Sequence, residues 1–213
     1  INTNEFNPKA FAAYRFDGGM FNTLRHSAEF GTGQLPGGFF VEGRLSKTNS
    51  DGFIDRSFSD LKSFFLKGGY LKENTRLRFN IFSGAEQTYQ AWYGVPEAIW
   101  KDQPQFNSAG TDFGLRDQPY ANETDNYQQD HYQLFLDQKL SSALEMHLAA
   151  FYTRGRGYYE QYKVDQDITA YQMPPLLAGQ DTLSQSDLIR QLWLDNHYVG
   201  GQASLNWQRK AWK

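Results

Sequence analysis

Residues 132–152 alternate between apolar and polar side chains, and most of the chain repeats this pattern. Within the segment, apolar residues recur at every second position on both sides of the Ser141–Ser142 pair: Leu134, Leu136, Leu144, Met146 and Leu148. Successive side chains of a β-strand point to opposite faces of its sheet. The segment therefore predicts a β-hairpin with one apolar face and one face that carries full charges.

A helix is the alternative for these residues. Ala, Leu, Glu and Met favour helices, and Ser142 and Glu145 have the spacing of a capping box. The period of a short apolar run does not by itself distinguish a helix from a strand. The rest of the chain favours the strand, because alternation recurs in segments spaced along it: residues 10–16, 21–30, 39–45, 63–70, 76–81 and 197–208.

The connections between these segments alternate in length. Short connections lie at residues 31–38, at 71–75 and at Ser141–Ser142, and longer ones at 46–60, 86–130 and 154–190. Long irregular loops usually carry function, and transmembrane barrels have short turns at one end and long extracellular loops at the other. The pattern predicts an all-β fold, an antiparallel up-and-down transmembrane β-barrel of about eight strands.

A soluble β-sandwich would also alternate, since it buries one face of each sheet and wets the other. Aromatic residues near the strand ends favour the barrel, because Tyr70, Tyr132, Tyr152 and Trp207 resemble the aromatic girdle of a membrane barrel. The opposite face carries the charged and titratable residues: Arg25, Glu29, Glu42, Arg44, Lys67, Arg76, Arg78, Asp137, Lys139, Glu145 and His147.

Composition narrows the possible functions. The chain has 213 residues, of which 16% are aromatic, and 19 are glycine. It has no cysteine, which excludes disulfide and thiolate chemistry. The net charge of −3 is too small to indicate a nucleic-acid partner. Since no run of 18 apolar residues occurs, we expect no membrane-spanning helix, whereas a barrel needs only alternate residues to be apolar.

The long connections are acidic and aromatic. Residues 86–130 hold eight acidic and two basic residues, a net charge of −6, which leaves +3 for the rest. Tyr and Trp side chains offer rigid area with a polar handle for a ligand. We therefore name ligand-contact candidates in the expected extracellular loops: Tyr89, Trp92, Tyr93, Trp100, Tyr158, Tyr159 and Tyr162. The alternative is that the loops pack on one another over the barrel mouth.

No catalytic or metal-binding pattern stands out. The histidines, at positions 26, 131, 147 and 197, lack metal-ligand spacing, and the sequence has no nucleophile elbow. Asp130 and His131 are a weak catalytic pair, because adjacent strand residues point to opposite faces. We expect no enzyme activity, no metal site and no cofactor.

Three passages resemble a known family: FNTLRHSAEFGTGQL at 21–35, LSKTNSDGFIDRSFSDLKSFFLKGGY at 45–70 and FSGAEQTYQAWYGVPEA at 82–98. They look like the start of the β-barrel of TonB-dependent outer-membrane receptors, particularly those of the Bacteroidetes type. The resemblance implies that residues 1–6 end a plug domain and that residues 7–213 form part of a barrel.

Such receptors carry a plug, a TonB-binding motif and about 22 strands, so we expect this chain to be a fragment, a partial barrel of about eight strands. By resemblance, the parent is a transporter of the bacterial outer membrane. It would work with the TonB complex through its plug, in contact with outer-membrane lipid, and import a ferric siderophore, haem, cobalamin or a glycan. The alternatives are a complete small eight-stranded barrel with a structural or adhesive role and a soluble carbohydrate-binding β-sandwich.

Overall fold

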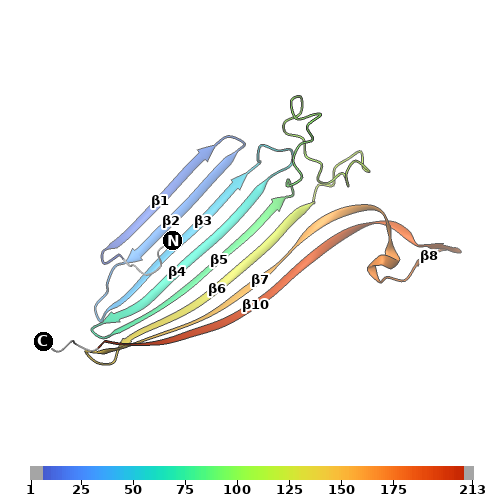
Figure 1. Cartoon of the computed structure of the whole chain (residues 1–213). Helices are drawn as coiled ribbons and strands as arrows, with labels where there is room; N and C mark the ends of the chain where they lie inside the picture. The colour runs from blue at the N-terminus through green and yellow to red at the C-terminus, as the bar shows by residue number, and fades with distance from the viewer. Residues whose placement is uncertain (1–6, 209–213) are drawn as a thin grey trace.

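A computed structural model describes residues 7–208, and their fold is all-β (Figure 1). Eight strands form one antiparallel sheet: β1 (Ala10–Gly19), β2 (Thr23–Thr32), β3 (Phe39–Ser50), β4 (Ser59–Lys72), β5 (Thr75–Tyr89), β6 (Thr124–Lys139), β7 (Leu144–Asp167) and β10 (Gln185–Trp207). A short 3-10 helix, η1 (Ile168–Tyr171), and a small hairpin of β8 (Leu176–Ala178) and β9 (Asp181–Leu183) separate β7 from β10. The residues expected to end a plug, 1–6, lie outside the described part.

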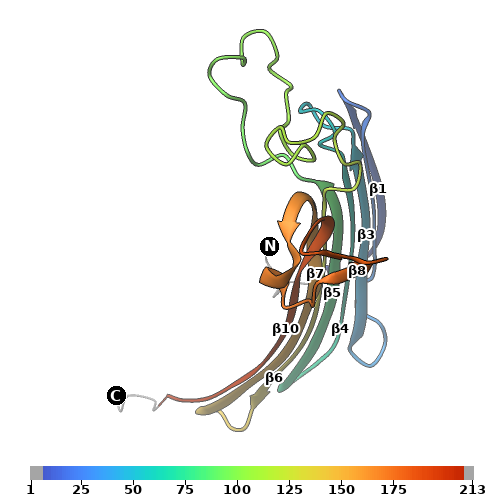
Figure 2. The ribbon, with the colours of Figure 1, turned by 90° about the vertical axis from the view of Figure 1, so that its right-hand side faces the viewer.

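Each strand of the sheet pairs with its neighbours in the order β1-β2-β3-β4-β5-β6-β7-β10. Within residues 7–208, β1 and β10 are the two edges and do not pair with each other. Figure 2 shows the sheet edge-on as a curved wall. This part of the chain contains neither a closed eight-stranded barrel nor a second large sheet packed on the first. The predicted antiparallel up-and-down partial barrel is therefore confirmed.

The strand register sorts the side chains into an apolar face and a polar face. On the apolar face, Leu77, Leu136 and Leu148 are cross-strand neighbours. On the polar face, Glu42 pairs with Lys67, whose ammonium lies 2.7 Å from the Glu42 carboxylate. The register places all eleven charged and titratable residues expected opposite the apolar side chains on this polar face.

Burial is inverted relative to a water-soluble protein, in which apolar side chains fill the interior. Leu134 and Leu205 on the apolar face are 50% and 64% exposed, whereas Lys67 and Asn80 on the polar face are 4% and 1% exposed. Apolar area in water costs about 25 cal/mol per Å², so an apolar surrounding would stabilise this face. The described residues contain no helix that is both long and apolar enough to span a membrane.

Aromatic rings lie over glycines of the neighbouring strands and fill the space that a side chain would take. A Cβ at Gly68 would lie 2.4 Å from a ring carbon of Phe79, and one at Gly200 equally close to Phe151. Larger residues at these two positions would displace the rings. Glycine within a strand often marks such a close approach.

The prediction of an irregular segment at 154–190 is wrong, because β7 continues to Asp167 and β10 begins at Gln185. Beyond Tyr152 the apolar face turns polar, with Arg154 opposite His197. Each face of the strands carries a mixture of polar and apolar side chains there, with Trp193 on one face and Leu194 on the other, so no alternation reveals them. The other two long connections also shorten, to residues 51–58 and 90–123.

Candidate functional site at the loop end of the sheet

Residues 90–123, here called the long loop, join β5 to β6 and project from one end of the sheet (Figure 2). Tyr89, the last residue of β5, is only 4% exposed. Its hydroxyl donates a 2.7 Å hydrogen bond to the carbonyl of Tyr120 and accepts one of 3.2 Å from Nε of Arg56. The Arg56 guanidinium also donates to the carbonyls of Asn107 and Ala109, at 2.6 and 3.0 Å. These bonds hold the long loop against the β3–β4 connection.

Glycine is required where the long loop passes this tyrosine. Gly110 has a φ of +84°, and a Cβ there would lie 2.2 Å from the Tyr89 hydroxyl oxygen. Both the backbone conformation and the close approach disfavour any larger residue.

A second attachment centres on Glu160, which lies on β7 beyond the apolar part of the strand. Its carboxylate accepts hydrogen bonds from the Tyr120 hydroxyl at 2.7 Å, the Asn122 amide at 2.6 Å and the Gln191 amide at 2.7 Å. Burial alone would raise the pKa of Glu160, but these three hydrogen bonds outweigh it and hold that pKa below its ordinary value. Burial and the bond to Glu160 raise the pKa of Tyr120 to about 12.

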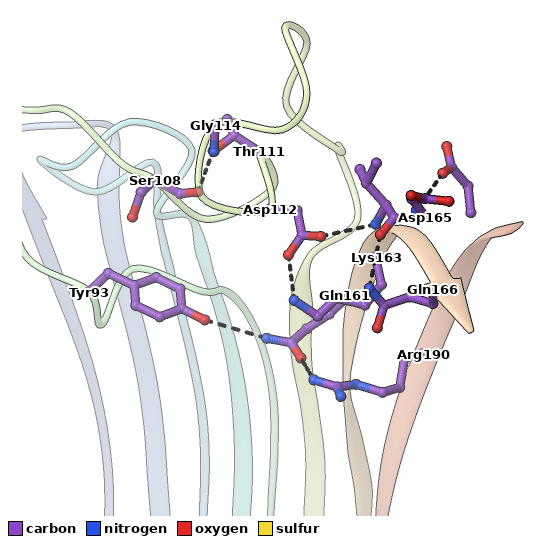
Figure 3. Close-up of polar contacts among 12 residues, drawn as sticks. Tyr93, Ser108, Thr111, Asp112, Gly114, Gln161, Lys163, Asp165, Gln166 and Arg190 are labelled. Carbon is purple, nitrogen blue, oxygen red and sulfur yellow. Dashed lines mark hydrogen bonds and ion pairs between the residues drawn. The ribbon is translucent and has the colours of Figure 1, made fainter. Parts of the chain in front are cut away.

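A third attachment joins the long loop to the far part of β7. Asp112 forms an ion pair with Lys163, and its other carboxylate oxygen accepts a 2.9 Å hydrogen bond from the Val164 backbone N–H (Figure 3). The Arg116 guanidinium lies 3.7 Å from the ring centroid of Tyr162, a cation–π contact. Two charged residues of the loop are thus neutralised or stacked against one strand.

Some polar atoms beneath the long loop lack a hydrogen-bond partner in the described part of the chain, among them Oε2 of Glu123 and Oε1 of Gln90. Glu123 is 4% exposed. Burial raises the pKa of Glu123 above its ordinary value, although backbone hydrogen bonds from Gly110 and Tyr162 and the charge of Lys163 oppose the rise. A buried carboxylate with an unpaired oxygen destabilises the docked loop at neutral pH.

Four aromatic residues, Trp92, Tyr93, Phe113 and Tyr159, form what we call the aromatic patch. Trp92 meets Tyr93 and Tyr159 edge-to-face, with centroids 6.3 and 5.8 Å apart, and Tyr93 meets Phe113 at 5.1 Å. Trp92 is 56% exposed, so rings of the patch are open to a ligand.

Polar groups lie beside the patch. The Gln161 amide donates a 3.5 Å hydrogen bond to the Tyr93 hydroxyl and accepts one of 2.5 Å from Arg190 (Figure 3). Such a combination of aromatic faces and hydrogen-bonding groups is suited to stacking against a ligand and orienting it.

The structure brings only three of the seven predicted contact residues, Trp92, Tyr93 and Tyr159, into the patch. Their role in ligand contact stays a prediction. Tyr162 packs on Tyr120, with centroids 5.5 Å apart, and Trp100 lies elsewhere on the long loop, close to the Lys101 ammonium.

Four of the seven do not lie in loops. Tyr89 ends β5, and Tyr158, Tyr159 and Tyr162 lie on β7, so the loop placement of these four is wrong. Tyr89 is buried as an anchor of the long loop, and Tyr158 packs on Trp193 with centroids 4.6 Å apart. The cause is the extension of both strands beyond the apolar band, where the alternation ceases.

Sequence reasoning missed the polar residues that hold the long loop, chiefly Arg56, Asn107 and Glu160. No local pattern marks them, because their partners lie far along the chain: the Asn107 amide donates to the carbonyls of Asp55 and Gln90, both at 2.9 Å. The one local signal for Glu160 is that this acidic residue directly follows two tyrosines.

Neither metal binding nor catalysis by Asp130 and His131 finds support in the described residues. Among residues 7–208, no group of three or more His, Asp or Glu side chains is arranged to hold a metal ion. Asp130 and His131 lie on opposite faces of β6, since Asp130 pairs with Arg154 and His131 with Thr153.

Comparison with known proteins finds a match in structure alone. No family model and no curated protein matches the sequence. The chain resembles the ferric-catecholate import receptor Fiu of E. coli K12, with a TM-score of 0.63 and 12% sequence identity over 93% of this chain. The match spans 29% of the length of that receptor. The likeness shows that the sheet has the fold of part of a receptor β-barrel.

Proposed function

We propose that this chain is part of the barrel of a TonB-dependent outer-membrane receptor that imports a scarce ligand. Residues 7–213 would belong to the barrel and residues 1–6 to the end of the plug. The observation that carries the proposal is the inverted sheet, whose apolar face is exposed while its polar face encloses charged groups. In the parent, the apolar face contacts lipid and the polar face lines the lumen.

The dimensions of the apolar face support a lipid contact. On β7 it runs from Leu144 to Tyr152, about nine residues, and a tilted strand crosses a bilayer in ~9–11 residues. The boundary of this face toward the loop end is oblique. One cross-strand row contains the apolar Phe64 on β4 but the charged Asp130 and Arg154 on β6 and β7. Strands that cross a flat bilayer at an angle of ~35–45° require such an oblique boundary.

The loop end supports a ligand-binding role. The long loop is held by buried hydrogen bonds, and the aromatic patch lies partly open beside Gln161 and Arg190. We infer that this end faces the exterior and meets a small molecule or metal chelate, such as a ferric siderophore, haem, cobalamin or a glycan. Uptake would require the plug of the parent and its TonB partner.

Two neighbouring alanines of β7 offer a matched test of membrane orientation. Ala150 pairs with Leu134 on the apolar face, and Ala149 pairs with Phe135 on the polar face. Ala150→Trp and Ala149→Trp would each be made in the full chain after its five natural tryptophans are replaced by Phe, then folded into phosphatidylcholine vesicles. Lipids with brominated acyl chains should quench the fluorescence of the Ala150→Trp variant several-fold more than that of the Ala149→Trp variant.

Aqueous acrylamide should give the reverse order, because the polar face is open to water. Equal quenching of the two variants by brominated lipid would contradict the proposed lipid contact. So would a chain that stays dispersed in water without detergent or vesicles, since that is the behaviour of a soluble sandwich.

A further inference from the structure

A hollow of about 490 Å³ lies on the apolar face, at its boundary with the loop end. Two adjacent cross-strand rows form most of it. The row farther from the loops contains Tyr14, Ala28, Leu45, Phe64 and Ser83, and the row nearer the loops contains His26, Lys47, Lys62, Ala85 and Gln128.

Side-chain size creates the hollow. Ala28, Ser83 and Ala85 leave a low floor, while Leu45 and Phe64 stand beside them. Leu45 is 62% exposed and Phe64 40% exposed, so the walls are apolar and open to the surroundings. A flexible hydrocarbon chain would bury these surfaces, whereas water would not.

The rim nearer the loops is cationic. Asp60 contacts both Lys47 and Lys62, so the three residues together carry a net charge of +1. The Lys62 ammonium is 4.0 Å from Asp60, and its side chain is 66% exposed, which leaves it available to an anion. His26 accepts or donates a 2.6 Å hydrogen bond with the Tyr14 hydroxyl at the same rim.

We propose that this hollow is a binding site for an anionic, phosphate-bearing lipid, which places an acyl chain on the floor and its phosphate beside Lys62 and Lys47. The inference rests on the proposed function, because it requires that the apolar face meets lipid. A free phosphate would contact only the cationic rim, whereas a lipid would contact the floor, the walls and the rim together.

Lys62 and Lys72 provide a matched pair of variants. Both lie on the apolar face of β4, Lys62 at the hollow and Lys72 at the opposite end of the strand. The full chain would be released from vesicles of equal phosphatidylglycerol and phosphatidylcholine into mild detergent, and retained lipid measured by native mass spectrometry. Lys62→Gln should lower phosphatidylglycerol retention about fivefold, the equivalent of ~1 kcal/mol per lysine near an anionic lipid. Lys72→Gln should leave it unchanged.

Ala85→Leu tests the floor without changing charge, and should reduce retention of phosphatidylglycerol by filling the hollow. Excess inorganic phosphate should not displace the lipid; displacement would indicate a free-anion site and overturn the proposal. Equal losses in Lys62→Gln and Lys72→Gln, or equal retention of the two lipids by the natural chain, would also overturn it.

The same samples distinguish this proposal from the proposed function. Protection of the strands from protease in vesicles reports insertion. Insertion without lipid preference would overturn only the lipid site. A chain that fails to insert and stays dispersed in water without detergent would overturn both.

Discussion

The apolar band of the sheet and its loop end follow opposite rules of burial. In the band, Leu134 is 50% exposed while Lys67 is 4% exposed. At the loop end, Tyr89 is buried at 4% and the Asp195 carboxylate is open to solvent. This contrast agrees with the proposed pair of surroundings, lipid at one level of the sheet and water at the other.

The apolar band and the loop end are also held together by different interactions. Backbone ladders and ring-over-glycine contacts hold the band, and the lipid is expected to supply its apolar cover. The loop end depends on hydrogen bonds between residues distant in sequence, such as Tyr120 with Glu160. Changes in the band should therefore act through lipid, and changes at the loop end through buried polar groups.

The largest expected effect comes from a charge placed in the band. Leu148→Arg points an arginine at the lipid and should lower the free energy of unfolding in vesicles by ~2–4 kcal/mol. Ala149→Arg, one residue away on the polar face, should cost far less. Denaturant titration of both variants in vesicles measures the difference, and equal costs would contradict the assignment of the faces.

The next effect concerns the anchor of the long loop. Tyr89→Phe removes the hydroxyl that pairs with Arg56 and the Tyr120 carbonyl, and should destabilise loop docking by ~1–3 kcal/mol. Limited proteolysis should then cleave residues 90–123 faster while the strands stay protected. Tyr93→Phe is the control, since its hydroxyl makes only a 3.5 Å contact; similar cleavage of both variants would contradict the anchoring role.

A smaller effect is the pH dependence of the docked loop. The pKa of Glu123 is raised above its ordinary 4.5, so the docked state gains stability as pH falls through that raised pKa toward 4.5. The pKa of Glu160 is lowered, so its contribution is complete above 4.5 and is lost as pH falls through the lowered pKa.

Hydrogen exchange of residues 90–123, corrected for intrinsic rates, should therefore show protection that rises in mild acid and falls below pH 4.5. Glu123→Gln should abolish the rise, and Glu160→Gln should lower protection at neutral pH. A rise that persists in Glu123→Gln would assign it to another group.

The smallest effect marks where the band ends. Arg154 and Asp195 form an ion pair on the continuation of the apolar face, with side chains 25% and 51% exposed. In water such an exposed pair contributes little, so Asp195→Asn should barely change the unfolding free energy. A loss as large as that expected for Leu148→Arg would place the pair in lipid, and the boundary of the band would then lie beyond it.

Much of the fold followed from alternation alone. The hairpin of β6 and β7 forms a strand pair despite its helix-favouring composition, because period-two burial across the sheet overrides local propensity. The prediction failed where the alternation stops. Residues 154–167 form strand beyond the apolar band, and Tyr158, Tyr159 and Tyr162 lie on that strand, where a loop was expected.

By itself the sequence determined which side chains share a face, because that depends only on the two-residue period of a strand. It also determined that one face is apolar over about the thickness of a bilayer. Only the tertiary structure decided where the long loop settles and which aromatics meet, as with Trp92 and Tyr159. Those contacts join residues far apart in the chain, and they depend on strand register and loop path, which no local period records.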